Sequence, residues 1–269
     1  MQQYKQEWFG NIRGDILAGI VVCLALFPEV IGFMIVAGVP PIVGVYATFF
    51  ITAIAAFFGS SKGMISAAAG SVALVLAHLV AEYGIQYLFA ATILAGILQV
   101  ALGLLKVGTL MRYIPKPVMT GFVNGLGIMM FTSQLDHFQG SLLLPLLGLL
   151  GIAIIFLFPR ITKKIPAPIV AILVITAIVL GFGLDVKTLG DMGSISTDLP
   201  RFGIPAVPMT VETLRIIFPT ALSVAIVGLV ESLLTAQLVD EITEEKSDKN
   251  QETLSQGLGN VVSGFFGGI

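Results

Sequence analysis

Residues 15–36 read DILAGIVVCLALFPEVIGFMIV, and this stretch decides the class of fold. Apart from Asp15 at its start, its only charged residue is Glu29, which follows Pro28. A helix needs about 20 predominantly apolar residues to cross the hydrocarbon core of a bilayer. A cleavable signal peptide has a shorter apolar region that ends at a small-residue cleavage site. We therefore interpret this stretch as a first membrane span.

The composition of the whole chain predicts that lipid is its main solvent. Of 269 residues, 56% are hydrophobic and only 11% are charged, whereas soluble domains carry about 25% charged residues. The formal net charge of −2 argues against nucleic acid as a partner. The single cysteine, Cys23, excludes an internal disulfide, and no Cys/His cluster predicts a metal site. Signature motifs of hydrolases and nucleotide-driven enzymes are missing from the sequence, so we expect neither an enzyme nor a cofactor.

Apolar stretches along the chain predict about nine transmembrane helices, of which the third and ninth are short. Residues 185–210 should form a surface loop outside the membrane with short extended pieces, and the polar residues 240–251 should lie in water. The expected spans are Asp15–Val36, Ile42–Phe58, Ser66–Ala81, Gln86–Leu105, Pro117–Leu135, Ser141–Phe158, Ala167–Leu184, Val211–Leu238 and Thr253–Phe266.

Basic residues predict the orientation, because Lys and Arg accumulate in cytoplasmic loops. If residues 1–14 are cytoplasmic, eleven of the 14 basic residues fall on the inner side and three on the outer side. We therefore expect a multi-pass protein of the plasma (inner) membrane with a cytoplasmic N-terminus. The three outer residues are Lys187, Arg201 and Arg215.

Two acids lie near the middle of predicted spans, Glu29 in the first and Glu231 in the eighth. A charge at mid-bilayer costs about 2.5–3.5 kcal/mol on insertion scales, so such residues commonly serve function. The alternative is a structural carboxyl, protonated or paired with a neighbouring helix. One acid at a similar depth in each helix is what an inverted repeat would produce. Pro28 should also open the first helix and free carbonyls that line a cavity.

The third span begins with small residues, from Gly63 through Gly70 and Ser71 to Val72. Small side chains let a ligand approach the backbone, and the N-terminus of a helix binds anions through free N–H groups and the helix dipole. A close helix–helix contact of the small-residue type explains the same stretch equally well. From the residues alone, both interpretations stay open.

Several motifs resemble those of the sulfate permease (SulP) family, which includes sulfate, bicarbonate and dicarboxylate carriers. The signature Pro-x-Tyr-Gly-Leu-Tyr followed by Gly-(Thr/Ser)-Ser-(Lys/Arg) is similar to residues 41–46 and 59–62 here, with Val43 and Val45 as mild departures. Further similar segments are residues 15–20, 114–122 and 257–269.

The resemblance implies a fold of seven plus seven inverted spans, with a mobile core and a gate. Residues 15–184 would be the first repeat, and residues 211–269 the start of the second. The anion would sit between the N-terminal ends of spans three and ten and move by alternating access of an elevator type. The chain stops at Ile269, before span ten and the STAS domain that usually follows, so half of the anion site would be missing.

The resemblance also implies roles for individual residues. Glu29 is commonly Gln in the family, so a second negative charge would need protonation or a partner, and Ala69 lacks the hydroxyl of some members. An acid followed by Thr four residues on serves ion coupling there; Glu231 fits H⁺ coupling or charge balance better than Na⁺ coupling. The implied substrate-binding residues are Phe27, Glu29, Ala69, Gly70 and Ser71, and the implied ion-coupling residues are Glu231 and Thr235.

These features predict secondary active transport of a small inorganic, sulfate-like anion. A bicarbonate or dicarboxylate carrier of the same family and an inactive fragment are the alternatives. A nucleobase carrier of the same architecture is disfavoured by the Gly59–Lys62 pattern, and a non-transporting sensor or anchor has no support in the sequence. The expected partners are the anion and the lipid bilayer, and a homodimer is left open.

Overall fold

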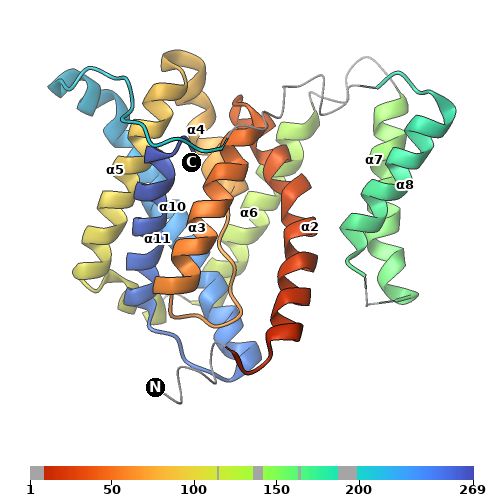
Figure 1. Cartoon of the computed structure of the whole chain (residues 1–269), viewed down its shortest axis with the longest axis horizontal. Helices are drawn as coiled ribbons and strands as arrows, with labels where there is room; N and C mark the ends of the chain where they lie inside the picture. The colour runs from red at the N-terminus through yellow and green to blue at the C-terminus, as the bar shows by residue number, and fades with distance from the viewer. Residues whose placement is uncertain (1–8, 114, 136–141, 163–164, 187–198) are drawn as a thin grey trace. The chain divides into compact units, whose positions relative to one another are not determined.

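The computed structural model describes residues 9–113, 115–135, 142–162, 165–186 and 199–269, and within these ranges the protein is all-α. In the described part of the chain, nine α-helices follow the nine predicted spans in order, which confirms the predicted fold class (Figure 1). Among the residues that the structure describes, five apolar stretches are long enough to cross a membrane, namely α2, α3, α5, α10 and residues 143–160, while α4 and α8 are shorter apolar helices. The helices are α2 (Ile12–Ala37), α3 (Pro41–Phe58), α4 (Gly70–Tyr83), α5 (Ile85–Leu104), α6 (Lys116–Gln134), α7 (Leu143–Leu157), α8 (Ala167–Phe182), α10 (Val211–Thr243) and α11 (Lys249–Phe265), with 3₁₀ turns at Val107–Tyr113 and Phe158–Arg160.

Helix α4 starts later than the sequence predicted. We expected the third span to begin at Ser66, but the helix begins at Gly70, after residues 64–69 without helical structure. Hydrogen bonds from helix α3 explain the difference. The Thr52 hydroxyl donates to the carbonyl oxygen of Ser66 at 2.6 Å, and the Ala68 amide donates to the Thr48 hydroxyl at 3.5 Å. These bonds take up backbone groups that a longer helix would use for itself.

Helices α10 and α11 reach further into the polar connection than expected. Helix α10 ends at Thr243 rather than Leu238, and α11 begins at Lys249 rather than Thr253. The side chain of Asp248 explains the earlier start of α11, because it accepts hydrogen bonds from the amides of Asn250 and Gln251 as an N-cap. Helix α2 runs through Pro28 without interruption, so the expected opening of the helix at this residue is wrong.

The chain divides into two compact units. The first comprises Met1–Glu29 and Leu135–Thr188, and it contains α7 and α8, which pack side by side. At the point where these helices meet, a Cβ added to Gly151 would lie 3.1 Å from the side chain of Ile175. Both helices also expose large apolar side chains, among them Leu149, Phe156, Leu173 and Phe182, which suits contact with lipid.

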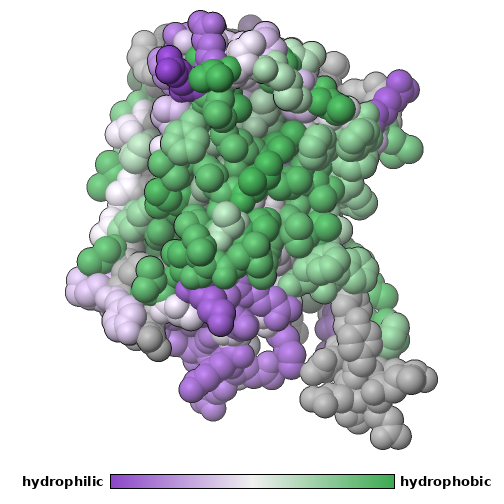
Figure 2. All heavy atoms as spheres, turned by 90° about the vertical axis from the view of Figure 1, so that its left-hand side faces the viewer, coloured by the Kyte–Doolittle hydropathy of each residue, from purple (hydrophilic) through white to green (hydrophobic). Residues whose placement is uncertain are grey.

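The second unit comprises Val30–Gln134 and Leu189–Ile269. Helix α11 packs between α5 and α3, and α10 packs against α4 and α5 (Figure 1). The buried core includes Met34, Val43, Leu76, Leu88 and Ala221. Figure 2 shows one face of the molecule, where a broad hydrophobic band has hydrophilic residues above and below it, as a bilayer requires.

Glycines let α5 and α11 approach each other closely. A Cβ on Gly96 would lie 2.6 Å from the carbonyl oxygen of Gly257 and 2.7 Å from the amide nitrogen of Val261. A Cβ on Gly257 would lie 2.7 Å from the amide nitrogen of Val100. Small residues at helix interfaces allow this kind of backbone contact in membrane proteins. Helix α11 is therefore held in one position along α5.

Candidate anion site

The N-terminus of α4 meets the middle of α10 at a polar contact. The hydroxyl of Ser71, the second residue of α4, donates a hydrogen bond to the carboxyl of Glu231. Ser71 is buried at 4% exposure and Glu231 is half-buried. The structure thus brings together two residues that the sequence singled out for different reasons.

The backbone at the start of α4 has the features of an anion site. Ala69 precedes the helix in an extended conformation and offers no side-chain cap. Gly70 and Ser71 are both buried. The first N–H groups of any helix lack partners within it, and the dipole places a partial positive charge there. A small anion bound at this terminus would receive hydrogen bonds from the backbone without needing a basic side chain.

Thr235 lies one turn beyond Glu231 on α10. Its hydroxyl donates to the backbone carbonyl oxygen of Glu231 at 3.0 Å, and its side chain is exposed. Residues four apart share a face of a helix, so Thr235 belongs to the same side of α10 as the acid. Its hydrogen bond is local, and its role in ion coupling stays a prediction.

Phe27 and Glu29 lie in the part of α2 that belongs to the first unit. The side chain of Phe27 is 43% exposed. The contact of Ser71 with Glu231 lies within the second unit. The assignment of Phe27 and Glu29 to the anion site therefore stays a prediction from the family resemblance.

Sequence reasoning missed Glu252, a buried carboxylate on α11 with 2% exposure. It accepts hydrogen bonds from the backbone amides of Ser60 at 3.0 Å and Ser61 at 3.3 Å. The motif Gly59–Lys62 is therefore bound by α11. The available signal was an acid followed by Gln256 and Asn260 at four-residue intervals, on a helix otherwise rich in small residues.

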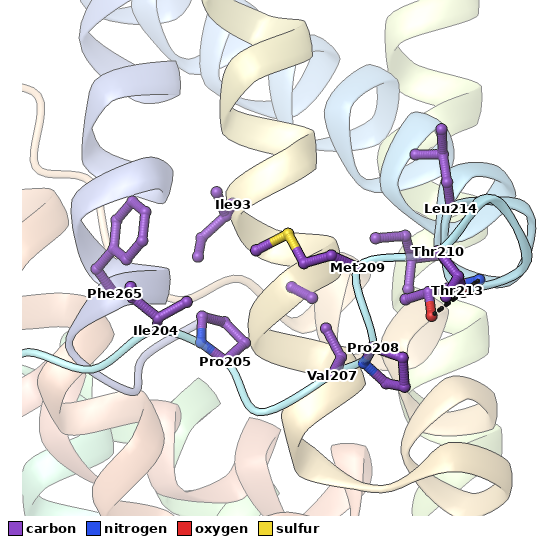
Figure 3. A pocket seen from close by; sticks show the side chains of 12 residues that line it. Ile93, Ile204, Pro205, Val207, Pro208, Met209, Thr210, Thr213, Leu214 and Phe265 are labelled. Carbon is purple, nitrogen blue, oxygen red and sulfur yellow. Dashed lines mark hydrogen bonds between the residues drawn. The ribbon is translucent and has the colours of Figure 1, made fainter.

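A cavity of about 310 Å³ lies elsewhere in the second unit, beneath residues 204–210 (Figure 3). Ile93, Phe265 and Met209 are among the apolar side chains that line it, and the hydroxyls of Thr210 and Thr213 lie 3.2 Å apart at one edge. Among the described residues, those that line the cavity carry no charge. An anion there would lose its hydration without replacement, which is costly. The cavity does not fit the predicted substrate.

The chain matches the model of the sulfate permease family over residues 12–142 and 141–269. This chain belongs to the sulfate permease family. It is 57% identical over 268 residues to the putative sulfate transporter YbaR of Bacillus subtilis, an alignment that covers 98% of this chain and 56% of the relative. The chain thus spans about half the length of the curated relatives it matches.

Solved structures agree with membership of the sulfate permease family. The transmembrane domain of the cyanobacterial bicarbonate transporter BicA matches with a TM-score of 0.86 and 28% identity, covering 97% of this chain and 74% of that one. The murine anion transporter Slc26a9, in its inward-facing state, shares the fold with a TM-score of 0.74 and 18% identity, covering 94% of this chain and 50% of that one. The protein is a multi-pass membrane protein of a transporter family.

Proposed function

We propose that this chain forms the anion-binding part of a secondary active transporter that moves small inorganic, sulfate-like anions across the plasma membrane. The observation that carries the proposal is the hydrogen bond between Ser71 and Glu231 at the N-terminus of α4. A half-helix that begins at mid-membrane with buried small residues offers N–H groups to an anion, as half-helix termini do in other transporters. The naming of YbaR as a putative sulfate transporter supports sulfate as the first substrate to test.

The carboxyl of Glu231 has a defined task in this proposal. A second negative charge beside the anion would repel it, so the carboxyl must be neutral or balanced by a cation while the anion is bound. Binding of H⁺ or Na⁺ at Glu231 would meet this condition and couple the ion to anion movement. Thr235, one turn further along α10, carries the hydroxyl that the family resemblance assigns to that ion. Movement would follow an alternating-access, elevator-like cycle, with no chemical conversion of the anion.

Bicarbonate is the second candidate substrate, because the transmembrane domain of the bicarbonate transporter BicA matches 97% of this chain. A helix N-terminus recognises charge and N–H acceptors, and both anions provide them. The choice between the two therefore depends on the size of the site rather than on the backbone alone.

The test is uptake of labelled anion into proteoliposomes that contain the full-length product of the gene. We expect uptake of labelled sulfate that unlabelled sulfate suppresses. Competition by bicarbonate, dicarboxylates and uracil then ranks the alternatives. Folded protein that takes up none of these anions would overturn the proposal. Reconstitution of the 269-residue chain by itself tests the alternative of an inactive fragment. Uptake at the rate of the full-length product would contradict the expectation that a tenth half-helix is needed.

A further inference from the structure

Helix α11 carries three polar side chains at four-residue intervals, Glu252, Gln256 and Asn260, which we call the polar ladder. Residues four apart lie on one face of a helix. Glu252 and Gln256 are 2% and 6% exposed, and Asn260 is half-buried. Buried polar groups are costly unless they are hydrogen-bonded, so the partners of these side chains are informative.

The first two residues of the polar ladder bind the segment that leads into α4. Glu252 accepts from the backbone amides of Ser60 and Ser61. The Gln256 amide nitrogen donates to the Glu252 carboxyl at 2.9 Å and to the hydroxyl of Ser66. Ser66 precedes the cap residue Ala69 by three positions, and its carbonyl is held by α3. Side chains of α11 therefore hold residues 60–66, the segment that precedes α4, by hydrogen bonds.

The third residue of the polar ladder binds the other half of the site. The side-chain amide of Asn260 donates to the Gln99 side-chain oxygen at 2.7 Å. The amide of Gln99 in turn donates to the backbone carbonyl of Ala225 on α10 at 3.4 Å. Gln99 is 1% exposed, and a Cβ on Gly228 would lie 3.3 Å from its amide nitrogen. This chain of bonds fixes α10 six residues before Glu231.

One helix thus holds both elements that meet at the Ser71–Glu231 contact. We propose that the polar ladder positions the N-terminus of α4 against Glu231, with Gln256 and Asn260 as positioning residues for anion binding. This inference rests on the proposed function, because it assumes that the anion binds at α4. Recognition by backbone dipoles depends on their placement to within a fraction of an ångström, which supporting hydrogen bonds secure. Without these hydrogen bonds, α4 would remain helical, but its N-terminus would no longer be held in place against α10.

A charge exchange within the polar ladder tests the proposal in the full-length protein. Gln256→Glu puts a second carboxylate against Glu252, and like charges in contact repel. The double variant Glu252→Gln/Gln256→Glu again places one carboxylate and one side-chain amide at positions 252 and 256. The carbonyl of Gln at 252 still accepts from the Ser60 and Ser61 amides, its NH₂ donates to the new carboxylate, and the Ser66 hydroxyl becomes a donor. Gln256→Met removes both bonds without adding a charge. Gln251→Glu makes the same exchange at an exposed residue of α11, where it also removes the hydrogen bond that the Gln251 amide donates to the Phe58 carbonyl oxygen at 3.2 Å.

Two readouts separate this inference from the proposed function. The first is amide hydrogen exchange of peptides covering residues 59–72, which needs no transport. The second is the KM and maximal rate of labelled sulfate uptake. We expect Gln256→Glu and Gln256→Met to speed exchange in this segment and raise KM about fivefold or more, and the double variant to return both to within about twofold of the unaltered protein.

The outcomes are decisive in either direction. Unchanged exchange and KM in both Gln256 variants would overturn the proposal, as would a double variant no better than Gln256→Glu. If Gln256→Glu does not fold, Gln256→Met and the double variant decide by the same criteria. If the unaltered protein transports no anion, the proposed function fails, while the exchange measurements still determine whether the polar ladder holds α4. Equal effects of Gln251→Glu would show that an added acid or a lost bond elsewhere on α11 loosens residues 59–72 as much as a change in the polar ladder does, and would also overturn it.

Discussion

The hydroxyl of Ser71 donates a hydrogen bond to the carboxyl of Glu231, a residue 160 positions further along the sequence. Because Ser71 is the second residue of α4 and Glu231 lies in α10, this bond joins a helix N-terminus to an acid in the middle of another helix. The positive end of the α4 dipole and the carboxyl therefore act on the same small volume.

Glu231→Gln tests the coupling role. Gln retains an oxygen that accepts from Ser71, so we expect near-normal yield of folded protein, but it cannot take up a proton or balance a cation's charge. Uptake of labelled sulfate driven by a pH or Na⁺ gradient should fall to the level measured without that gradient. Glu212→Gln, at the exposed start of the same helix, is the matched control and should keep the gradient response. A Glu231→Gln protein that fails to fold would show that the acid is structural.

A double-mutant cycle between Ser71→Ala and Glu231→Gln measures the contact itself. Ser71→Ala leaves the carboxyl without its donor, and a hydrogen bond to a charged group contributes about 1.5–3 kcal/mol. We expect Ser71→Ala to lower the free energy of unfolding in mixed micelles by about 1–3 kcal/mol, with a smaller cost when Glu231 is already Gln. Additive costs of the two substitutions would mean that the side chains do not interact.

The glycine contact between α5 and α11 predicts which glycines tolerate a side chain. Gly96→Ala puts a methyl group against the backbone of α11, and overpacking costs about 1–3 kcal/mol. A Cβ on Gly121 in α6 meets nothing within 4 Å. We expect Gly96→Ala to lower the thermal midpoint in detergent and the yield of folded protein, and Gly121→Ala to leave both unchanged. A Gly96→Ala protein as stable as the unaltered one would contradict the close packing.

The sequence predicts the helices well because an apolar run of about 20 residues has one outcome in lipid. It predicts the start of α4 less well, because small residues such as Ala67 and Ala68 suit a helix and an extended segment alike. The tertiary bonds from Thr48 and Thr52 decide between them. The chemistry of a helix N-terminus points to Ser71, and the cost of a charge at mid-bilayer points separately to Glu231. Their contact depends on how α4 packs against α10, which no local pattern encodes.

Two ion pairs next to the Gly59–Lys62 motif should differ in their contribution to stability. The Lys249 Nζ and Asp240 Oδ2 atoms lie 2.7 Å apart, and these side chains are 18% and 19% exposed. The Lys62 Nζ and Glu245 Oε2 atoms lie 3.4 Å apart, and these side chains are 63% and 57% exposed. Exposed pairs contribute about 0–1 kcal/mol, and the cost of removing one member rises as a pair becomes less exposed, as in the part-buried Lys249–Asp240 pair. We expect Lys249→Met to lower the free energy of unfolding by about 1–3 kcal/mol and Lys62→Met by less than about 1 kcal/mol. Equal losses, or a loss that salt abolishes for Lys249→Met, would contradict this difference in burial.

The distribution of basic residues predicts the orientation of the chain, and helix α10 offers a direct test. Its 33 residues span about 50 Å, more than the thickness of a bilayer core, so we expect its two ends to lie on opposite sides. Met209, before the helix, is 90% exposed, and Glu244, directly after it, is exposed as well. In a Cys23→Ser background, the Met209→Cys variant should react with a membrane-impermeant maleimide on intact cells, and Glu244→Cys only after permeabilisation. The opposite pattern would place the N-terminus outside, and labelling of both on intact cells would mean that α10 does not cross the membrane.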